Sequence, residues 1–320
     1  MGAVHQLIVT HGRDGAAEIL GPKKKPVVEI ASKALAADPD EIAVTYSGFC
    51  LTGLPHKRPA DNEIWERKTE RVTLLMEPGT LPGLNSDGTQ RKIGVPYGAR
   101  GRLLLIWLQT EALRTGSREI EMGGSMRSWL GNLGISIGGE TTRAFRQQAN
   151  RLSLCKLTFF WKDENGKHAA FENASIVKRG MLDLDEALGD DRQGRFWDPV
   201  VVLDETFFKA LQDHPVPLAD AAIAALRDRS MAIDVYVWLA YRLHVLKKPT
   251  PVSWAALFGQ FGGGFKALKH FKDKGGFKDA LESALAAYPD ARVTIDDPRH
   301  GIVLHPSPPP VPKRLVSISR

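Results

Sequence analysis

The sequence predicts an α+β fold in which a module of three helices and a β-hairpin occurs twice. Between residues 96 and 154, apolar side chains recur with helical spacing in three successive segments. Two strand-like segments follow around Asn165-Gly166, a dipeptide typical of a tight hairpin turn. The same order recurs between residues 232 and 305. Because this is the order of a winged helix-turn-helix, we expect tandem winged helix-turn-helix domains, preceded by a small N-terminal extension that contains strands.

The composition is that of an average folded protein. The chain has 320 residues, of which 43% are hydrophobic and 25% charged, and this length favours two domains. Cys50 and Cys155 are too few for a disulfide framework, which fits a reducing compartment. The N-terminus lacks the pattern of a secretion signal, and the longest apolar run, Leu103 to Leu108, is far shorter than a membrane span. We therefore expect a cytoplasmic protein with no membrane partner.

The first 95 residues are predicted to lie outside the repeated module. Residues 1–40 carry several glycines and the basic run Lys23 to Lys25, which indicate a flexible basic arm. A short helix from Val27 is expected to end at Asp38-Pro39. Residues 41–95 begin with strand-like alternation and end in a loop rich in glycine and proline, so they are predicted to form a strand and loop extension.

The first winged-helix domain is expected over residues 96–205. Its elements are predicted as helices around 103–113, 125–133 and 141–154, followed by strands over 156–161 and 168–177. The second domain is expected over residues 206–312, before a C-terminal tail at 313–320. Its elements are predicted as helices over 232–246, 253–261 and 265–288, followed by strands over 292–295 and 302–305.

Two details favour a duplication of one module. The segment Trp129 to Gly134 aligns with Leu257 to Gly262, and both share the pattern apolar, apolar, Gly, amide, apolar, Gly at the end of a second helix. A tryptophan also occupies the first helix of each module, Trp107 and Trp238. We interpret these matches as a tandem repeat.

The sequence lacks the common catalytic motifs. It has no Gly-x-x-x-x-Gly-Lys-Ser/Thr phosphate loop, no His-Glu-x-x-His and no Gly-x-Ser-x-Gly. No two histidines lie two residues apart, as the metal pair of a nicking initiator would require. Asp183-Leu184-Asp185 resembles a metal-binding carboxylate pair, but capping of a short segment is the favoured interpretation. We therefore expect no enzyme activity, no cofactor and no metal site.

The third helix of the first module carries side chains suited to duplex DNA. With Phe145 at the centre of the buried face, helical geometry places Arg143, Gln147 and Asn150 near the opposite side. Arg146 and Arg151 flank them, and Lys156 follows the helix. Arginine donates to guanine and Asn or Gln to adenine, while the flanking cations can hold phosphates, so this pattern predicts a major-groove helix.

The charge of the chain is concentrated in the same module. The formal charge of the chain is +6, and between residues 96 and 160 nine basic side chains face four acidic ones. The alternative, a merely solvated helix face, would predict glutamate and lysine mixed together. The observed bias favours contact with an anionic partner, which we expect to be double-stranded DNA.

Further basic residues are expected to contact the DNA backbone. In the second module most of these residues are lysines, whose point charges suit phosphates. They are Lys266, Lys269, His270, Lys272 and Lys274. Lys162 and Lys167 in the first hairpin, and Arg299 in the second, are expected at wing turns that enter a minor groove or touch phosphates. An ordinary charged surface is the alternative for both groups.

Short motifs spread over residues 45–312 carry a family resemblance. In chain order they are Phe49-Cys50, Leu54-Pro55-His56-Lys57, Trp65-Glu66-Arg67, Glu77-Pro78-Gly79, Gly94-Val95-Pro96-Tyr97-Gly98, Leu108-Gln109-Thr110-Glu111-Ala112, Val216-Pro217-Leu218, Asp234-Val235-Tyr236-Val237-Trp238-Leu239, Tyr288-Pro289 and Pro306-Ser307-Pro308. With these motifs the chain resembles the plasmid-encoded RepA family of replication initiators.

The resemblance implies a plasmid replication initiator. Such a protein would bind repeated duplex sites at the plasmid origin, promote origin opening, and recruit the host helicase together with a host replication initiator. Initiators of similar design repress their own promoter as homodimers and bind repeats as monomers, which would contribute to plasmid copy control. No family motif fixes the individual base contacts, so the residues of the third helix rest on helical geometry alone.

Two other functions stay open at this point. A winged-helix transcriptional regulator without replication activity would bind a single inverted repeat at a promoter, whereas an initiator would bind direct repeats of about 20 base pairs beside an AT-rich stretch. A nuclease or primase with an unfamiliar site would show metal-dependent strand cleavage or synthesis.

Overall fold

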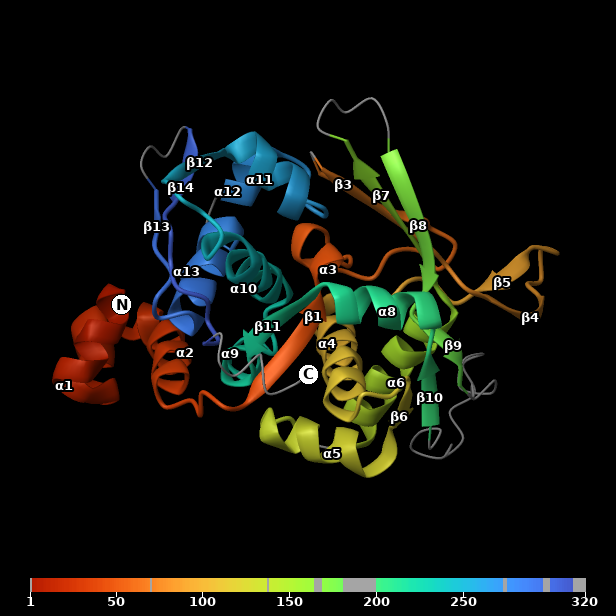
Figure 1. Ribbon diagram of the computed structural model, residues 1–320, viewed down its shortest axis with the longest axis horizontal. Helices are drawn as coiled ribbons and strands as arrows, with labels where there is room; N and C mark the ends of the chain where they lie inside the picture. Colours follow the sequence, from red (N-terminus) through yellow and green to blue (C-terminus); the bar gives the residue numbers. More distant parts are fainter. Residues whose placement is uncertain are drawn as a thin grey trace. The chain divides into compact units, whose positions relative to one another are not determined.

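A computed structural model describes residues 2–69, 71–136, 138–163, 169–180, 200–272, 275–295 and 300–312 (Figure 1). Helices alternate with small sheets, which confirms the α+β class. The chain divides into two compact units. Unit 1 comprises Met1–Leu51 and Val216–Arg320, and unit 2 comprises Thr52–Pro215. These limits differ from the expected boundaries at 95/96 and 205/206, because the N-terminal segment packs on C-terminal elements.

Unit 2 begins with two hairpins. The elements are, in order, β2 (Trp65–Lys68), β3 (Val72–Glu77), β4 (Thr80–Leu84), β5 (Gln90–Lys92), α4 (Gly98–Thr115), β6 (Glu119–Glu121), α5 (Gly123–Asn132), α6 (Gly139–Leu154), β7 (Lys156–Lys162), β8 (Ala169–Ser175), β9 (Val177–Arg179), β10 (Val200–Leu203) and α8 (Glu205–Asp213). The three predicted helices and both strands of the predicted hairpin are confirmed within a few residues.

The predicted hairpin has an unpredicted partner. Strands β7 and β8 join β2 and β3 in one antiparallel sheet of order β2-β3-β7-β8, with Leu74 opposite Phe159 and Glu77 opposite Lys156. A second sheet has the order β6-β10-β9, and its edge strand β6 lies between α4 and α5 in the chain. Strands β7 and β8, which directly follow α6 in the chain, therefore do not pair with β6.

Helix α4 is the centre of unit 2. Nearly all of its side chains from Leu103 to Gln109 are buried, so it is covered on every side rather than on one stripe. Trp107 packs against Trp129 of α5, with ring centroids 6.3 Å apart. Gly116 ends the helix in the left-handed conformation (φ 65°) that favours glycine.

Unit 1 combines both ends of the chain. Its elements are, in order, α1 (Ala3–Leu20), η1 (Pro22–Lys24), α2 (Lys25–Leu35), β1 (Ile42–Tyr46), α3 (Ser47–Leu51), β11 (Pro215–Ala219), α9 (Asp220–Leu226), α10 (Ser230–Leu243), β12 (Thr250–Ser253), α11 (Trp254–Phe261), α12 (Leu268–Lys272), α13 (Phe277–Ala287), β13 (Val293–Thr294) and β14 (Gly301–Leu304). Strands β1 and β11 pair, and β12-β14-β13 form a small antiparallel sheet.

The C-terminal part of unit 1 follows the predicted order of helices and hairpin. Trp238 of α10 packs against Phe261 of α11 at 5.5 Å, which repeats the contact of Trp107 with α5 in unit 2. At Gly301 (φ 150°), a Cβ atom would lie 2.0 Å from the Val252 carbonyl oxygen, so only glycine lets β14 approach β12. The helix expected over 265–288 is divided into α12 and α13, with Gly275 at φ 85° between them.

The first forty residues are not the flexible arm that their glycines suggested. They form α1 and α2, and Figure 1 shows α2 beside α13. Helix α2 buries Val28, Ile30 and Ala31, which provide the apolar area that fixes the segment. Gly12 only kinks α1, and Gly21 ends it. Among the described residues, no helix is both long enough and apolar enough to cross a membrane.

Candidate nucleic-acid interface

Helices α5 and α6 form a helix-turn-helix pair in unit 2. Helix α5 ends at Asn132, and Gly134 adopts a left-handed conformation (φ 66°) in the turn. The Gly134 N–H donates to the Gly131 carbonyl, which closes this turn. Helix α6 then begins after Gly138 and runs for 16 residues. The predicted break between the second and third helices is confirmed.

One side of α6 carries the polar residues predicted to contact DNA. Arg143 and Gln147 are exposed and lie one helical turn apart, with Arg146 half-buried beside them. We call these three residues the α6 outer face. On the preceding helix, Arg127 is also exposed. Guanidinium and amide groups therefore reach solvent from adjacent positions of one helix pair.

The predicted exposure of Asn150 and Arg151 is wrong. Both are buried, with 7% and 5% of their surface exposed. Arg151 Nη2 donates to Asp61 Oδ1 at 2.9 Å, and its guanidinium carbon lies 5.4 Å from the ring centroid of Tyr97. Neither side chain belongs to the surface that the first half of α6 presents.

The second half of α6 is buried because the segment that leads into α4 lies against it. The Tyr97 N–H donates to Gln148 Oε1 at 2.8 Å. At Gly94 (φ 77°), a Cβ atom would lie 2.1 Å from Arg151 Nη1, so the backbone passes the guanidinium where no side chain fits. A helical wheel uses residues 139–154 alone, so it could not predict that the segment before α4 buries the second half of α6.

A buried arginine on α4 holds a second stretch of the N-terminal segment. Arg102 donates from Nη2 to the Leu54 carbonyl at 2.6 Å and from Nη1 to the Pro55 carbonyl at 3.1 Å. The Gly98 N–H also donates to the Pro55 carbonyl. The motifs around residues 54–57 and 94–98 thus meet beside α4 and α6, on the side of α6 away from Arg143 and Gln147.

The first predicted wing is only partly described. Lys156 is exposed on β7 opposite Glu77 of β3, and Lys162 is half-buried at the end of the same strand. Lys167 lies outside the described residues. Since β7 belongs to the sheet with β3, its two lysines sit on that sheet and not on the sheet that contains β6.

The basic residues of unit 1 lie on and around α12. Lys266, Lys269 and His270 are exposed. Lys272 lies over the ring of Trp254, with Nζ 5.1 Å from the centroid, and Lys278 approaches the same ring at 5.8 Å. Lys274 and Arg299 lie outside the described residues, as do Asp183 and Asp185.

Helix α13 is covered by the N-terminal helices. Lys24 Nζ donates to both carboxylate oxygens of Glu282, and His5 Nε2 donates to the Ala286 carbonyl at 2.9 Å. Leu281 is buried and Leu285 half-buried on the same side of the helix. This side of α13 is apolar with one carboxylate, so it lacks the chemistry that reads bases.

The two cysteines are unsuited to nucleophilic chemistry. Burial raises the pKa of the Cys155 thiol to about 12 and that of the Cys50 thiol well above its usual value. Both thiols therefore stay protonated at neutral pH. Within the described ranges, no three His, Cys, Asp or Glu side chains gather in a way that could hold a metal ion.

Solved structures and curated proteins were compared with the chain. A crystal structure of selenomethionine-labelled domains 2 and 3 of RctB is 10% identical, with a TM-score of 0.49, and covers 86% of this chain and 100% of its own. A second structure of RctB domains 2-3 is 11% identical, with a TM-score of 0.44, and covers 80% and 93%. At TM-scores below 0.5 these likenesses establish no shared fold. No curated protein matches the chain.

The family model described as plasmid encoded RepA protein matches residues 95–255, just over half of the chain. The matched region contains the α5–α6 helix pair of unit 2 together with α10 and β12 of unit 1. It also contains several of the motifs that carried the resemblance, including the segment from Gly94 to Gly98 apart from its first residue. The chain belongs to the family of plasmid-encoded RepA proteins.

Proposed function

We propose that the protein initiates plasmid replication by binding repeated duplex DNA sites at the origin through the α6 outer face. The binding would promote opening of the adjacent duplex and recruitment of the host helicase, and the protein itself would catalyse no reaction. Family membership supports the replication role. The single observation that supports the DNA contact is the exposed pair Arg143 and Gln147, with the half-buried Arg146 beside them, on the second helix of a helix-turn-helix pair.

We also propose that both units contain a winged helix-turn-helix. In unit 1, the order α10, β12, α11, α13, β13, β14 with sheet order β12-β14-β13 supports this assignment. In unit 2, the order α4, β6, α5, α6, β9, β10 with sheet order β6-β10-β9 supports it equally. On this proposal the β7–β8 hairpin is an insertion between the third helix and its wing strands.

The chemistry of the α6 outer face fits base recognition. Arg143 can donate two hydrogen bonds to guanine O6 and N7, and Gln147 can pair with adenine N6 and N7. Arg146 beside them, and Lys156 exposed on β7 directly after α6, would hold phosphates and fix the register of the helix in the groove. Each base pair read in this way contributes about 1–3 kcal/mol of discrimination.

Unit 1 would add affinity without sequence preference. Lys269 and His270 are exposed on α12, and Lys266 precedes them. Lysine is a point charge that suits phosphates more than base edges. We propose that these residues contact the DNA backbone, so that their contribution falls as salt rises.

Footprinting on the plasmid's own origin region tests the proposal. We expect protection of direct repeats by the wild type, and loss of that protection in Arg143→Ala at the same protein concentration. Arg114→Ala is the matched control, since Arg114 is exposed on α4 and pairs with Glu111 of the same helix. Protection that survives Arg143→Ala unchanged would remove α6 from the interface.

A replication assay separates an initiator from a transcriptional regulator. A small plasmid that carries the origin should replicate only when the wild-type protein is supplied from a second plasmid, and Arg143→Ala should abolish that maintenance. Maintenance without the protein, combined with footprints only at its promoter, would favour the regulator.

A further inference from the structure

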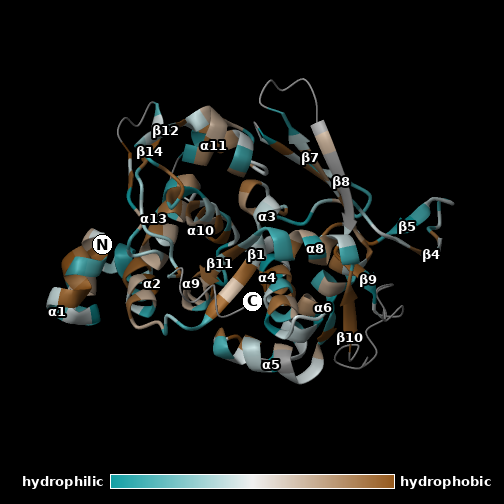
Figure 2. Ribbon diagram, in the orientation of Figure 1, coloured by the Kyte–Doolittle hydropathy of each residue, from teal (hydrophilic) through white to brown (hydrophobic). Residues whose placement is uncertain are grey.

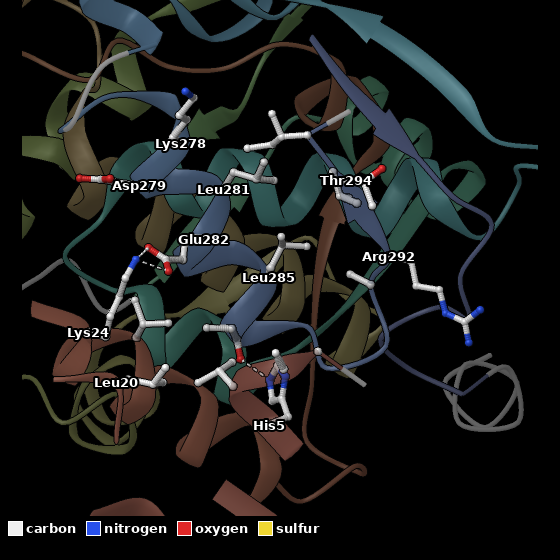
Figure 3. Close-up of a pocket in the computed structure, with 18 of the residues that line it drawn as sticks. His5, Leu20, Lys24, Lys278, Asp279, Leu281, Glu282, Leu285, Arg292 and Thr294 are labelled. Carbon is white, nitrogen blue, oxygen red and sulfur yellow. Dashed lines mark hydrogen bonds and ion pairs between the residues drawn. The ribbon is translucent and has the colours of Figure 1, made fainter. Parts of the chain in front are cut away.

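Unit 1 contains a pocket of about 900 Å³ between α1, α13 and β13 (Figure 3). Most of its lining is apolar. The apolar side chains that matter here come from three elements and are Val4, Leu7, Leu20, Leu281, Leu285 and Val293. The pair Lys24 and Glu282 spans one side, as Figure 3 shows. A volume of this size lies at the upper end of the range of ligand pockets in proteins, so it can hold several apolar anchors at once.

Two of the exposed apolar side chains of unit 1 line this pocket, and two more lie on α1. Among the described residues, eight large hydrophobic side chains are exposed, and four of them lie on α1 or directly after β13. These four are Val9, Ile19, Leu20 and Ile295, with 68%, 56%, 36% and 43% of their surface exposed. Leu20 and Ile295 also line the pocket, and Figure 2 shows brown, hydrophobic segments along α1. Scattered exposed side chains need no explanation, but a cluster beside a pocket marks an interaction surface.

The charges around the pocket favour an acidic partner. Lys23 and Lys25 are exposed next to Lys24, while Lys278 and Arg292 lie at the pocket itself. Glu282 is neutralised by Lys24, and Asp279 accepts a hydrogen bond from the Gly275 N–H. Three cations, Lys24, Lys278 and Arg292, and two carboxylates, Asp279 and Glu282, line the pocket, so the net charge of the lining is +1.

DNA does not fit this surface. Bases are read by planar donors and acceptors in a groove, and phosphates by unpaired cations, whereas Leu281 and Leu285 present apolar area. An amphipathic helix is the partner that such a groove takes, with anchors at positions i, i+3, i+4 and i+7. Helix α1 supplies one wall and α13 the other.

We propose that the pocket between α1, α13 and β13 binds an acidic amphipathic helix of a partner protein. The apolar anchors of that helix would fill the space between Leu20 and Leu285, and its acidic flanks would face Lys278 and Arg292. This function is separate from DNA binding, because none of its residues belongs to the α6 outer face.

A synthetic peptide of about 18 residues, with leucines at helical spacing and glutamates on both flanks, is the probe. We expect the full chain to bind it with a Kd in the micromolar range, measured by fluorescence anisotropy, and more weakly as salt rises. The same peptide with lysine in place of glutamate should bind at least about tenfold more weakly. Equal binding of the two peptides, or no binding at roughly 1 mM, would overturn the proposal.

Three substitutions locate the site. Leu20→Asp and Ile295→Asp should each weaken peptide binding about tenfold or more, since a carboxylate in an apolar groove costs its desolvation. Val245→Asp is the control, because Val245 is 59% exposed but does not line the pocket. Both test positions are exposed, so the variants should fold, and a thermal unfolding curve checks this. Origin binding by Leu20→Asp should equal that of the wild type.

Other occupants give different outcomes. If a second copy of the chain fills the groove, Leu20→Asp will convert a dimer to a monomer in sedimentation experiments, and the peptide will not bind the dimer. If the site takes only small apolar molecules, a fluorescent apolar dye will bind and the peptide will not displace it. Either result would overturn the proposal, as would equal weakening by Val245→Asp.

Discussion

Helix α6 follows α5 in unit 2, and α13 follows α11 and the short α12 in unit 1, yet the two helices present opposite surfaces. The first half of α6 exposes Arg143 and Gln147, while the corresponding surface of α13 carries Leu281 and Glu282, packs against α2 and pairs with Lys24. The cover differs because the chain before each module differs. In unit 2 the preceding segment reaches only the second half of α6. Position within a module therefore does not decide which surface of a helix is exposed, whereas the segments packed against the helix do.

The largest expected effect concerns the buried half of α6. Gly94→Ala should destabilise the protein by about 2–4 kcal/mol, since the new Cβ would meet Arg151 Nη1 and the backbone is left-handed there. Urea denaturation measures this loss. Gly88→Ala is the matched control, because Gly88 has a similar φ of 80° but open space around it, and it should cost about 1 kcal/mol. Equal losses of unfolding free energy in the two variants would mean that Arg151 is not packed closely against the backbone at Gly94.

A smaller effect is expected from the carboxylate that pairs with Arg151. Asp61→Ala should cost about 1–3 kcal/mol of unfolding free energy, because it leaves a guanidinium that is 6% exposed without this acceptor. Glu111→Ala breaks the pair with Arg114, which is 66% exposed, and should cost less than about 1 kcal/mol. Adding Arg151→Met to Asp61→Ala should recover part of the loss. If Glu111→Ala lowered the unfolding free energy as much as Asp61→Ala, the pair of Arg151 with Asp61 would not depend on burial for its contribution.

The sequence predicted the local elements well. The three helices of unit 2, the strands on both sides of Asn165-Gly166 and the helix–helix–hairpin order of unit 1 all rest on periodicity within short segments, which the sequence contains directly. It also placed Arg143 and Gln147 on one exposed side of a helix.

Long-range packing could not be predicted in this way. The pairing of β7 with β3, the burial of Arg151 against Asp61, and the docking of α2 on α13 each join residues about 80 to 260 positions apart. Gly12 and Gly21 suggested a loop because glycine lowers the stability of a helix, and glycine can be recognised in the sequence. The apolar contacts of these helices with the rest of unit 1 offset that loss, and they cannot be recognised in the sequence. The motifs around residues 54–57 and 94–98 carried the family resemblance, but nothing in them indicated that the two segments meet.

Unit 1 should affect DNA affinity without affecting sequence preference. Lys269→Ala should weaken binding to every duplex by less than about 1 kcal/mol and lower the slope of log K against log salt by roughly one. Titrations with an origin repeat and with a shuffled duplex at several salt concentrations measure both quantities. A larger loss on the origin repeat than on the shuffled duplex would mean that α12 reads bases.

The smallest expected effect is a pH dependence of stability from His5, which contacts α13. Burial lowers the pKa of His5 below its usual value of 6.5, against the hydrogen bond to Ala286 and the nearby charge of Asp290, which raise it. The folded protein therefore binds a proton on His5 less readily than the unfolded chain does. Stability from this group is complete above about pH 6.5 and is lost as pH falls through the folded pKa. We expect a loss of about 1 kcal/mol or less, which thermal unfolding at pH 7.5 and pH 5.5 can detect.

His5→Gln is the comparison for that measurement. Its unfolding midpoint should depend less on pH over this range, since glutamine does not titrate. An unchanged dependence would show that the contact of α1 with α13 does not sense protonation of His5.

The most direct test of the account is the ratio of two dissociation constants, that for a shuffled duplex over that for an origin repeat, at one salt concentration. Arg143→Ala should lower this ratio by about 5- to 150-fold, since it removes a bidentate base contact of about 1–3 kcal/mol. Glu282→Gln on α13 should leave the ratio unchanged, because that side chain faces Lys24 and not DNA. A ratio that Arg143→Ala does not change, or that Glu282→Gln lowers as much, would contradict the claim that the α6 outer face reads the sequence.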